Sequence, residues 1–271
     1  MDKIRVSCHG MRHTAGARHN DRDQLDYTKE KNVHIQQELS SENFYWIRFK
    51  DKTLTFQEAE WLFYKNIYSD GIDAQNQRNI KAGHPKRNKT VQDIFHDKRT
   101  CPDEFIFQIG DADVQEKWDL PTKRKMKKIM IKAAFDTCKA SSKGHYGFNI
   151  IDLAYHVDEL GGAHVHVRGT YCASYRGHWV PRQRLALEQA GFMRPYPEES
   201  LSRYNNPKIT FTNYLRDTFL EKVRELIATN NLDVEVQNIR HPEIPDKHLS
   251  TREYKKTITN FVEEVVQDKI L

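Results

Sequence analysis

Three histidines within eleven residues constrain this chain more than any other feature of its sequence. They lie in the segment Tyr155-His-Val-Asp-Glu-Leu-Gly-Gly-Ala-His-Val-His-Val-Arg168, as His156, His164 and His166. The chain has 13 histidines among 271 residues, which gives about 0.5 for an average window of this length. Such a cluster needs a structural or a chemical reason.

The residues around the cluster predict an antiparallel hairpin. Segments 148–157 and 163–171 are rich in β-branched and aromatic residues, and the stretch between them is rich in turn residues. Residues two apart on a strand share a face, so His164 and His166 are expected to project together. The return strand is expected to bring His156 opposite them.

This convergence predicts a metal site. Neutral imidazole is the commonest metal ligand, and three such ligands leave positions open for substrate oxygens, as in catalytic sites. The alternative is that His-Val-His-Val marks the polar face of a half-buried strand. Asp158 and Glu159, at the turn, are expected to add a ligand, to orient an imidazole or to move a proton.

The other elements follow from periodicity and from helix-capping residues. The capping box Thr55 to Glu58 predicts a helix that ends at Ser69-Asp-Gly71, and residues 73–99 predict a long loop or a small helical excursion. A strand is expected at 103–109. Further helices are expected at residues 121–139, 183–190, 212–229 and 250–269.

The predicted fold class is α+β, with a central antiparallel sheet that carries the histidine hairpin, helices packed around it and further helices at the C-terminus. No alternation of strands and helices with a glycine-rich phosphate loop is present. We expect a catalytic domain over residues 1–200 and a C-terminal helical extension over 201–271. No apolar run of about 18 residues and no secretory signal is visible, which predicts a cytoplasmic protein without a membrane segment.

The histidine segment resembles the His-x-Asp-Glu-x-x-Pro-His-x-His signature of the Mob/Pre family, the plasmid mobilisation and recombination relaxases among the HUH endonucleases. It departs from that signature in one respect: Leu160-Gly-Gly-Ala163 replaces the proline and adds one residue. Near the N-terminus, Gly16-Ala-Arg-His-Asn-Asp-Arg22 resembles the family's second motif, His-Asn-x-Arg. The stretch from Asn43 to Trp46 is similar to the segment that follows this motif.

The resemblance implies a relaxase-like fold and an enzyme that nicks and rejoins one DNA strand at a plasmid or mobile-element origin. It implies His19 as the nucleophile that forms a covalent DNA adduct, with Arg22 and Glu159 as further catalytic residues. It also implies a divalent metal ion, expected to be Mn²⁺ or Mg²⁺, and single-stranded or hairpin origin DNA as the partner. A homodimer is left open.

Several basic and amide residues are candidates for DNA binding. Basic residues gather at 81–89 and at 123–132, and a lysine-rich start of a helix opposes the helix dipole, which favours a phosphate-facing surface over a stabilising role. A merely solvated face is the alternative. The predicted DNA-binding residues are Arg18, Asn20, Asn43, Lys86, Arg87, Lys123 and Arg124.

Three other functions stay open on the sequence. The first is a rolling-circle replication initiator of the same superfamily, with a tyrosine nucleophile. The second is a catalytically inactive DNA-binding repressor, and the third is a metallohydrolase that does not act on nucleic acid. The candidate tyrosines are Tyr27, Tyr45, Tyr171, Tyr175, Tyr214 and Tyr254.

Overall fold

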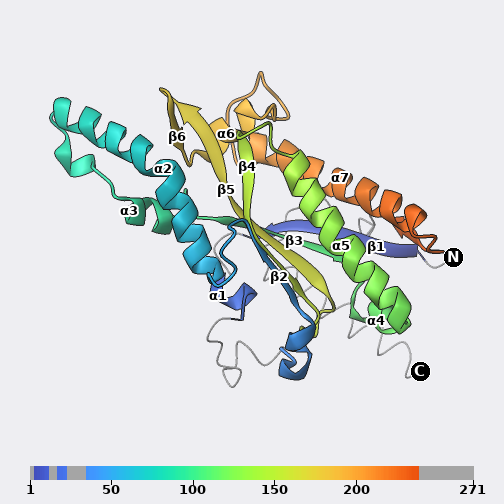
Figure 1. The fold of residues 1–271 in the computed structure, drawn as a ribbon. Helices are drawn as coiled ribbons and strands as arrows, with labels where there is room; N and C mark the ends of the chain where they lie inside the picture. Colours follow the sequence, from blue (N-terminus) through green and yellow to red (C-terminus); the bar gives the residue numbers. More distant parts are fainter. Residues whose placement is uncertain (1–2, 12–16, 23–34, 238–271) are drawn as a thin grey trace, which may run out of the picture. The chain divides into compact units, whose positions relative to one another are not determined.

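A computed structural model describes residues 3–11, 17–22 and 35–237 of the chain (Figure 1). It confirms the predicted α+β class: one mostly antiparallel sheet has the strand order β2-β4-β5-β3-β1-β7, and β6 pairs with β5. The strands are β1 (Lys3–Met11), β2 (Phe44–Ile47), β3 (Asp103–Ile109), β4 (Gly147–His156), β5 (His164–Tyr175), β6 (His178–Val180) and β7 (Glu235–Gln237).

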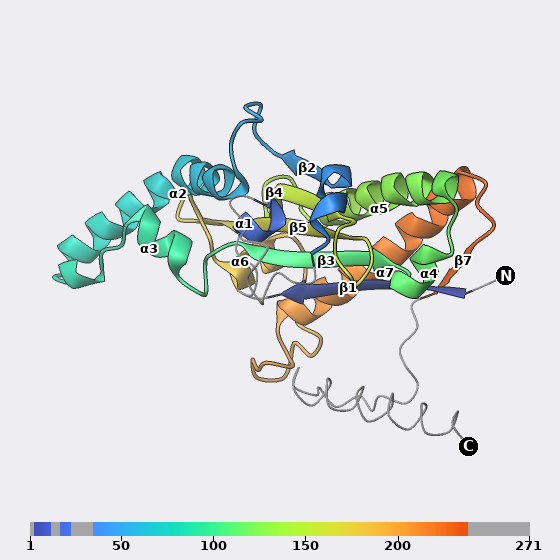
Figure 2. The same cartoon turned by 90° about the horizontal axis from the view of Figure 1, so that it is seen from below.

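Helices cover both faces of the sheet (Figures 1 and 2). The described helices are α1 (Ala17–Asn20), α2 (Phe56–Lys81), α3 (Val91–His96), α4 (Ala112–Glu116), α5 (Leu120–Ala140), α6 (Gln183–Gln189) and α7 (Pro207–Thr229), with the 3-10 turns η2 (Gln37–Glu42) and η3 (Pro85–Arg87). Apolar residues of α5, α6 and α7 form one core with the sheet. Apolar residues of α2 form a second core on the other face, over β4.

The histidine hairpin forms as predicted. Strands β4 and β5 pair in antiparallel fashion, and His156 and His164 are directly opposite each other at its turn end. The predicted strand at 103–109 is β3, which pairs with β5 on the other side. Helix α5 confirms the predicted helix at 121–139, and its Ile129 and Met130 are buried, as expected.

Helix α2 corrects the expectation that Ser69-Asp-Gly71 ends it, because the helix continues to Lys81. The Ser69 hydroxyl donates a hydrogen bond of 2.6 Å to the carbonyl oxygen of Lys65, one helical turn earlier. The serine is therefore compatible with the interior of the helix. A Cβ atom at Gly71 would lie 2.3 Å from the Trp179 carbonyl oxygen of β6. This glycine therefore allows β6 to approach α2 closely, and tertiary packing offsets its low helix propensity.

Replacing Gly71 with alanine is expected to destabilise the protein by roughly 1–3 kcal/mol, the usual range for overpacking. In an exposed helix the same change stabilises by about 1 kcal/mol, so the sign of the effect tests the close approach. Urea unfolding measures it, with Asp73→Ala, at an exposed position of α2, as the control. A Gly71→Ala protein as stable as the wild type would contradict this packing.

Of the two expectations for residues 73–99, a long loop or a small helical excursion, the structure shows the helical one. Up to Lys81 they belong to α2, and the predicted helical excursion is present as η3 and α3. Helix α3 begins with a second capping box, in which the Thr90 side chain accepts from the Asp93 amide and the Asp93 carboxylate accepts from the Thr90 amide. The bounds of this helix could not be predicted, because six residues are too few to show a clear helical periodicity.

Helix α7 begins at Pro207, earlier than the predicted residue 212, because Asn206 caps it by accepting from the Lys208 amide. Its residues Phe211, Leu215 and Phe219 are fully buried in the same core as the sheet. The described residues all belong to one compact unit, while the predicted functional division at residue 200 stays a prediction. The helix predicted at 250–269 lies outside the described residues. None of the described helices is both long and apolar enough to span a membrane.

Candidate metal centre and active site

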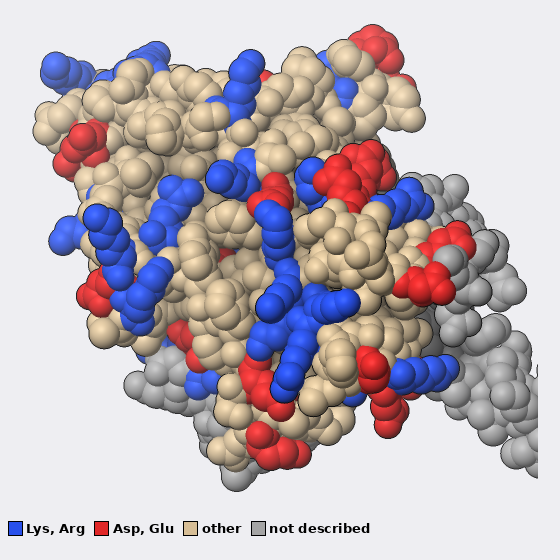
Figure 3. All heavy atoms as spheres, turned by 45° about the vertical axis from the view of Figure 1, so that its right-hand side comes forward, with Lys and Arg blue, Asp and Glu red and all other residues tan. Residues whose placement is uncertain are grey.

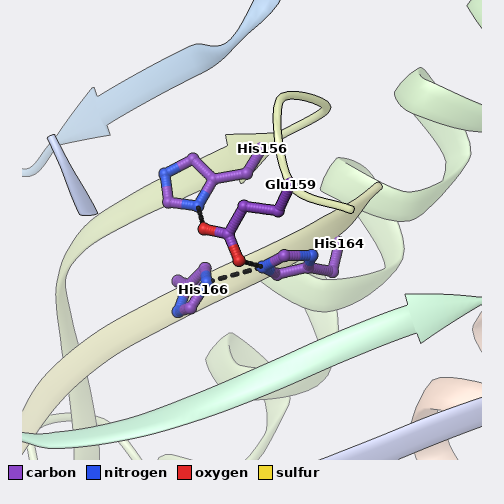
Figure 4. Close-up of side chains that lie close together, drawn as sticks. All are labelled: His156, Glu159, His164 and His166. Atoms are coloured by element: carbon purple, nitrogen blue, oxygen red, sulfur yellow. Dashed lines mark hydrogen bonds and ion pairs between the residues drawn. The ribbon is translucent and has the colours of Figure 1, made fainter. Parts of the chain in front are cut away.

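Four side chains meet at the turn end of the β4–β5 hairpin (Figure 4). One ligand atom from each of His156, Glu159, His164 and His166 lies within 4.8 Å of the other three. The cross-strand pairing of His156 with His164 and the two-residue spacing of His164 and His166 produce this arrangement. The convergence expected from the sequence is therefore present.

Each imidazole is held by a protein acceptor through one of its two nitrogens. His164 Nδ1 lies 2.8 Å from the Gly162 carbonyl oxygen, and His166 Nδ1 lies 2.5 Å from Glu104 Oε1. His156 Nε2 lies 2.7 Å from the Asn20 carbonyl oxygen. Because these oxygens only accept, the three nitrogens donate, and in the neutral ring the other nitrogen keeps its lone pair.

The remaining nitrogens fit a bound cation. His164 Nε2 and His166 Nε2 face each other at 2.8 Å, and two lone pairs at this distance repel unless positive charge lies between them. His156 Nδ1 is buried and accepts no hydrogen bond from any of the described residues, and it lies 3.2 Å from Glu159 Oε1. Three imidazoles and one carboxylate are a ligand set that suits a divalent transition metal ion.

Burial keeps these rings in the form that binds metal. It lowers the pKa of His164 to about 3, with the neighbouring His166 adding to the effect. It also lowers the pKa of His156 below the ordinary value, despite the nearby Glu159 carboxylate. Both rings are therefore neutral near pH 7, and metal binding there does not have to displace a proton from them.

Glu159 reaches the cluster despite the longer glycine loop. Gly162 has a φ of 87°, and a Cβ there would lie 2.9 Å from the Ala112 amide nitrogen, so only glycine closes this turn without strain. Glu159 Oε2 lies 3.5 Å from His164 Nε2. Burial opposes its negative charge, but contacts with His156 and His19 hold the pKa of Glu159 well below its ordinary value.

The N-terminal motif lies against this cluster. His19 Nε2 is 3.4 Å from Glu159 Oε1, and Arg22 Nη2 is 2.9 Å from the same oxygen. The two motifs are separated by more than a hundred residues in the chain, yet one carboxylate contacts both. The His19 side chain is 23% exposed, so solvent reaches it.

Asp158 forms an ion pair with Arg22. Its two oxygens accept from Arg22 Nε at 3.0 Å and from Nη2 at 2.5 Å, a bidentate pair. Ser40 and Asn43 donate to the same carboxylate. Arg22 has a φ of 59°, in the left-handed region that a non-glycine residue adopts at some energetic cost. The ion pair stabilises this backbone conformation.

Two residues predicted to contact DNA have structural partners instead. Asn20 is fully buried and donates to Glu104 Oε1 at 2.6 Å, so its side chain does not reach a DNA-facing surface. The half-buried Asn43 donates to Asp158 and accepts from the Val157 amide at 2.9 Å, which fixes the turn. The role of both residues in DNA binding stays a prediction. Arg18 is exposed and donates to Gln57 at the start of α2.

The predicted basic residues lie in two separate places. Lys123 and Arg124 are exposed in the first turns of α5. Lys86 and Arg87 are exposed in η3, beyond the C-terminal end of α2, whereas α1 packs at the other end of that helix. A helix with the 26 residues of α2 is about 39 Å long. The structure therefore does not bring Lys86 and Arg87 to the histidine cluster.

The sequence did not reveal a buried charge network behind the cluster. Glu104 on β3 accepts from His166, and Arg168 on β5 donates to Glu60 of α2 at 2.6 Å. Despite burial, the hydrogen bond from His166 lowers the pKa of Glu104 to about 2. The sequence signal for this network was Glu104, an acidic residue at the start of an apolar strand. Its partners could not be predicted, because they depend on the pairing of β3 with β5.

Asp152 in this network gives a pH-dependent prediction. Burial and the nearby Glu60 carboxylate raise its pKa well above the ordinary value, and neither of its oxygens has a hydrogen-bond partner among the described residues. The folded protein therefore keeps a proton that the unfolded chain releases above a pH of about 4. The difference in bound protons lowers the free energy of unfolding by up to about 1.4 kcal/mol per pH unit, as pH rises towards the pKa of Asp152 in the folded protein.

Asp152→Asn removes this titration and keeps the shape of the side chain. We expect the difference between the free energy of unfolding of this variant and that of the wild type to increase in favour of the variant as pH rises from 5 to 8. Urea unfolding at several pH values measures the difference. Asp113→Asn, at an exposed position of α4, is the control and should show a constant difference. A constant difference for Asp152→Asn as well would mean that Asp152 is ionised in the folded protein.

Comparison with known proteins gives a limited similarity. No protein-family model and no curated protein matches the chain. Two solved structures are similar, both of the MobM relaxase domain (MOBV; Mob_Pre) with manganese and with 22-nucleotide oriT DNA of plasmid pMV158, in one case with a 3′-thiophosphate. Each is 16% identical, and the alignments cover 93% of this chain and 98% of the other, with TM-scores of 0.46 and 0.45. Among solved structures, the chain is thus similar to the relaxase domain of a Mob_Pre protein.

Proposed function

We propose that this protein nicks and rejoins one DNA strand in a metal-dependent transesterification at a plasmid or mobile-element origin, with His19 as the nucleophile. One observation carries the proposal: His19 Nε2 lies 3.4 Å from the Glu159 oxygen that also lies 3.2 Å from His156 Nδ1. A candidate nucleophile and a candidate metal centre therefore share one carboxylate. The resemblance of both motifs to those of relaxases supports the same assignment.

The divalent ion would be held by His156, His164 and His166. Glu159 would be a fourth ligand or would contact one of these histidines. The chemistry that such an ion supplies is withdrawal of charge from a phosphate oxygen, which makes the phosphorus more electrophilic. The Glu104 carboxylate and the Gly162 and Asn20 carbonyl groups fix the orientations of the three rings. Held in this way, the ligands need little rearrangement to bind.

In the reaction, a neutral imidazole nitrogen of His19 donates its lone pair to phosphorus. A nitrogen–phosphorus bond forms, and a phosphorus–oxygen ester bond breaks. The leaving oxygen takes the bonding electrons and gains a proton, while the ring loses the proton on its other nitrogen. The product is a phosphoramidate adduct, which the free hydroxyl later attacks to restore the ester and release His19.

Arg22 is placed to stabilise charge that develops on the phosphate. Its Nη1 donates to the His19 carbonyl oxygen at 2.8 Å, and Asp158 holds its other side. Burial opposes the positive charge of Arg22, but the hydrogen bond to Asp158 raises its pKa above the ordinary value, so the guanidinium stays charged. A fixed cation beside the nucleophile stabilises a transition state without rearrangement.

The test uses the full chain with a radiolabelled pool of random-sequence single-stranded oligonucleotides, with Mn²⁺ or with EDTA. We expect a labelled protein band on a denaturing gel that requires the metal and that loses most of its label after nuclease digestion, which leaves only the attached nucleotide. DNA that is bound but never attached or cut would support the repressor. If DNA neither binds nor is cut with Mn²⁺ or Mg²⁺, both nucleic-acid functions are excluded and a metallohydrolase remains.

A tyrosine nucleophile is the second candidate, and the structure favours Tyr45 among the described tyrosines. Its ring packs edge-on against His156 with centroids 6.4 Å apart, and 38% of the residue is exposed. Tyr171 is buried, whereas Tyr175 and Tyr214 lie elsewhere, on β5 and α7. Tyr27 and Tyr254 lie outside the described residues. A Tyr45→Phe variant that no longer forms the adduct would favour this chemistry.

Glu104→Gln tests the proposed orientation of His166. Losing the charge-assisted hydrogen bond from His166 is expected to weaken metal binding by about 10- to 100-fold, the usual effect of such a partner. Calorimetric titration with Mn²⁺ measures the affinity, and Glu116→Gln, at an exposed position of α4, is the control. Unchanged affinity would mean that Glu104 serves only the buried charge network.

A further inference from the structure

A groove lies between the edge strand β2 and helix α5. It has a volume of about 440 Å³ and is lined by Phe44, Arg124, Lys127, Lys128, Ile131 and Lys132. Figure 3 turns the α5 side of the molecule forward and shows Lys and Arg side chains gathered near the middle of this face. The helical residues that line the groove recur at intervals of three and four positions along α5, so they share one side of the helix.

Three of the four cations in the groove have no acidic partner in an ion pair among the described residues. Among the described residues, Arg124 and Lys128 form no ion pair, and Lys127 donates only to the Glu42 carbonyl oxygen, 2.5 Å away. Lys132 pairs with Asp136. Burial lowers the pKa of Lys127, and the Glu42 carboxylate offsets this in part. An anion in the groove would relieve this accumulation of positive charge.

Strand β2 connects the groove to the candidate active site. Tyr45 packs against His156 on one face of the sheet, while the preceding residue, Phe44, lines the groove on the other face. Both aromatic side chains are 38% exposed at the sheet edge. The edge of β2 thus has an aromatic ring on each face and a row of cations beside it. Proteins that bind single-stranded nucleic acid combine aromatic stacking surfaces with charged grooves in the same way.

We propose that a single DNA strand leaves the active site across the edge of β2 and enters this groove, with a base stacked on Phe44 and phosphates on Arg124 and Lys128. The inference rests on the proposed function, because only a nucleic-acid substrate would follow this path. From Arg124 to Lys132 the helix rises about 12 Å. At about 3.4 Å per phosphate in a stacked strand, this stretch holds three or four phosphates.

The experiment measures binding of fluorescein-labelled dT20 to the full chain in EDTA over a range of salt concentrations. Arg124→Ala/Lys128→Ala should weaken binding and reduce the salt slope by about 1.4, or about 0.7 for each lost phosphate contact. Phe44→Ala should weaken binding about 5- to 150-fold with little change in slope, because it removes stacking and not charge. Unfolding curves confirm that each variant folds.

The matched control is Lys125→Ala/Lys139→Ala, which removes the same charge from the same helix outside the groove lining. If the control lowers the slope as much as the groove variant does, or if dT20 binding does not depend on the groove residues, the inference is wrong. Equal losses for a 20-bp duplex would also contradict it, because a duplex has no unstacked base for Phe44. Because these assays contain no metal, failure to form an adduct would overturn the proposed function and leave the groove result intact.

Discussion

His19→Ala is expected to abolish the covalent DNA adduct and to lower the nicking rate by about 10³-fold or more, since no other group replaces a lost nucleophile. DNA affinity should change little, because the ring is one of many contacts. Stability should change by about 1 kcal/mol, the usual effect of one substitution, because the ring is 23% exposed but contacts Glu159. Time courses of nicking with Mn²⁺ measure the rate.

The control for His19→Ala is His84→Ala, an exposed histidine that follows α2. It should nick at the wild-type rate. A His19→Ala protein that still forms the adduct would assign the chemistry to another residue, and Tyr45 would be the first to test. A protein that still nicks but forms no adduct would indicate hydrolysis by water.

His164→Ala is expected to remove metal-dependent stabilisation. A protein that binds an ion only when folded gains about 2.7 kcal/mol at a free ion concentration of 100 times the Kd. The variant lacks one of the three proposed imidazole ligands, so Mn²⁺ should no longer raise its free energy of unfolding at that concentration. Urea unfolding with Mn²⁺ and with EDTA measures the difference within each protein, which separates the metal effect from the loss of a buried ring.

The control for His164→Ala is His178→Ala on β6, which should keep the full stabilisation by Mn²⁺. An equal gain in stability for His164→Ala would place the ion elsewhere. No gain for the wild type would mean that the four side chains are a hydrogen-bonded polar cluster and not a metal centre.

Features set by local sequence were the predictable part of this structure. The alternation of residues in β4 and β5 and the glycine turn between them were enough to predict the hairpin and the meeting of the three histidines. Helix α5 was equally clear from its 3.6-residue periodicity. In each case the neighbours that matter are close in the chain, so spacing alone specifies which side chains share a face.

Features set by tertiary packing could not be predicted in this way. The glycine at 71 is a helix-ending signal in isolation, and only the position of Trp179 explains why α2 continues through it. The role of Glu104 depends on the pairing of β3 with β5, two strands far apart in the sequence. The side chains of Asn20 and Asn43 have suitable chemistry for DNA contact, but their burial and their hydrogen-bond partners depend on the folded chain and could not be predicted.

The most direct test of the account is to find which residue carries the nucleotide. The full chain is incubated with Mn²⁺ and the single-stranded pool, then digested with nuclease and trypsin without exposure to acid, which hydrolyses phosphorus–nitrogen bonds. Mass spectrometry should find a nucleotide on the peptide His19–Arg22. A nucleotide on Asn32–Arg48, which contains Tyr45, or on any other peptide would contradict the account.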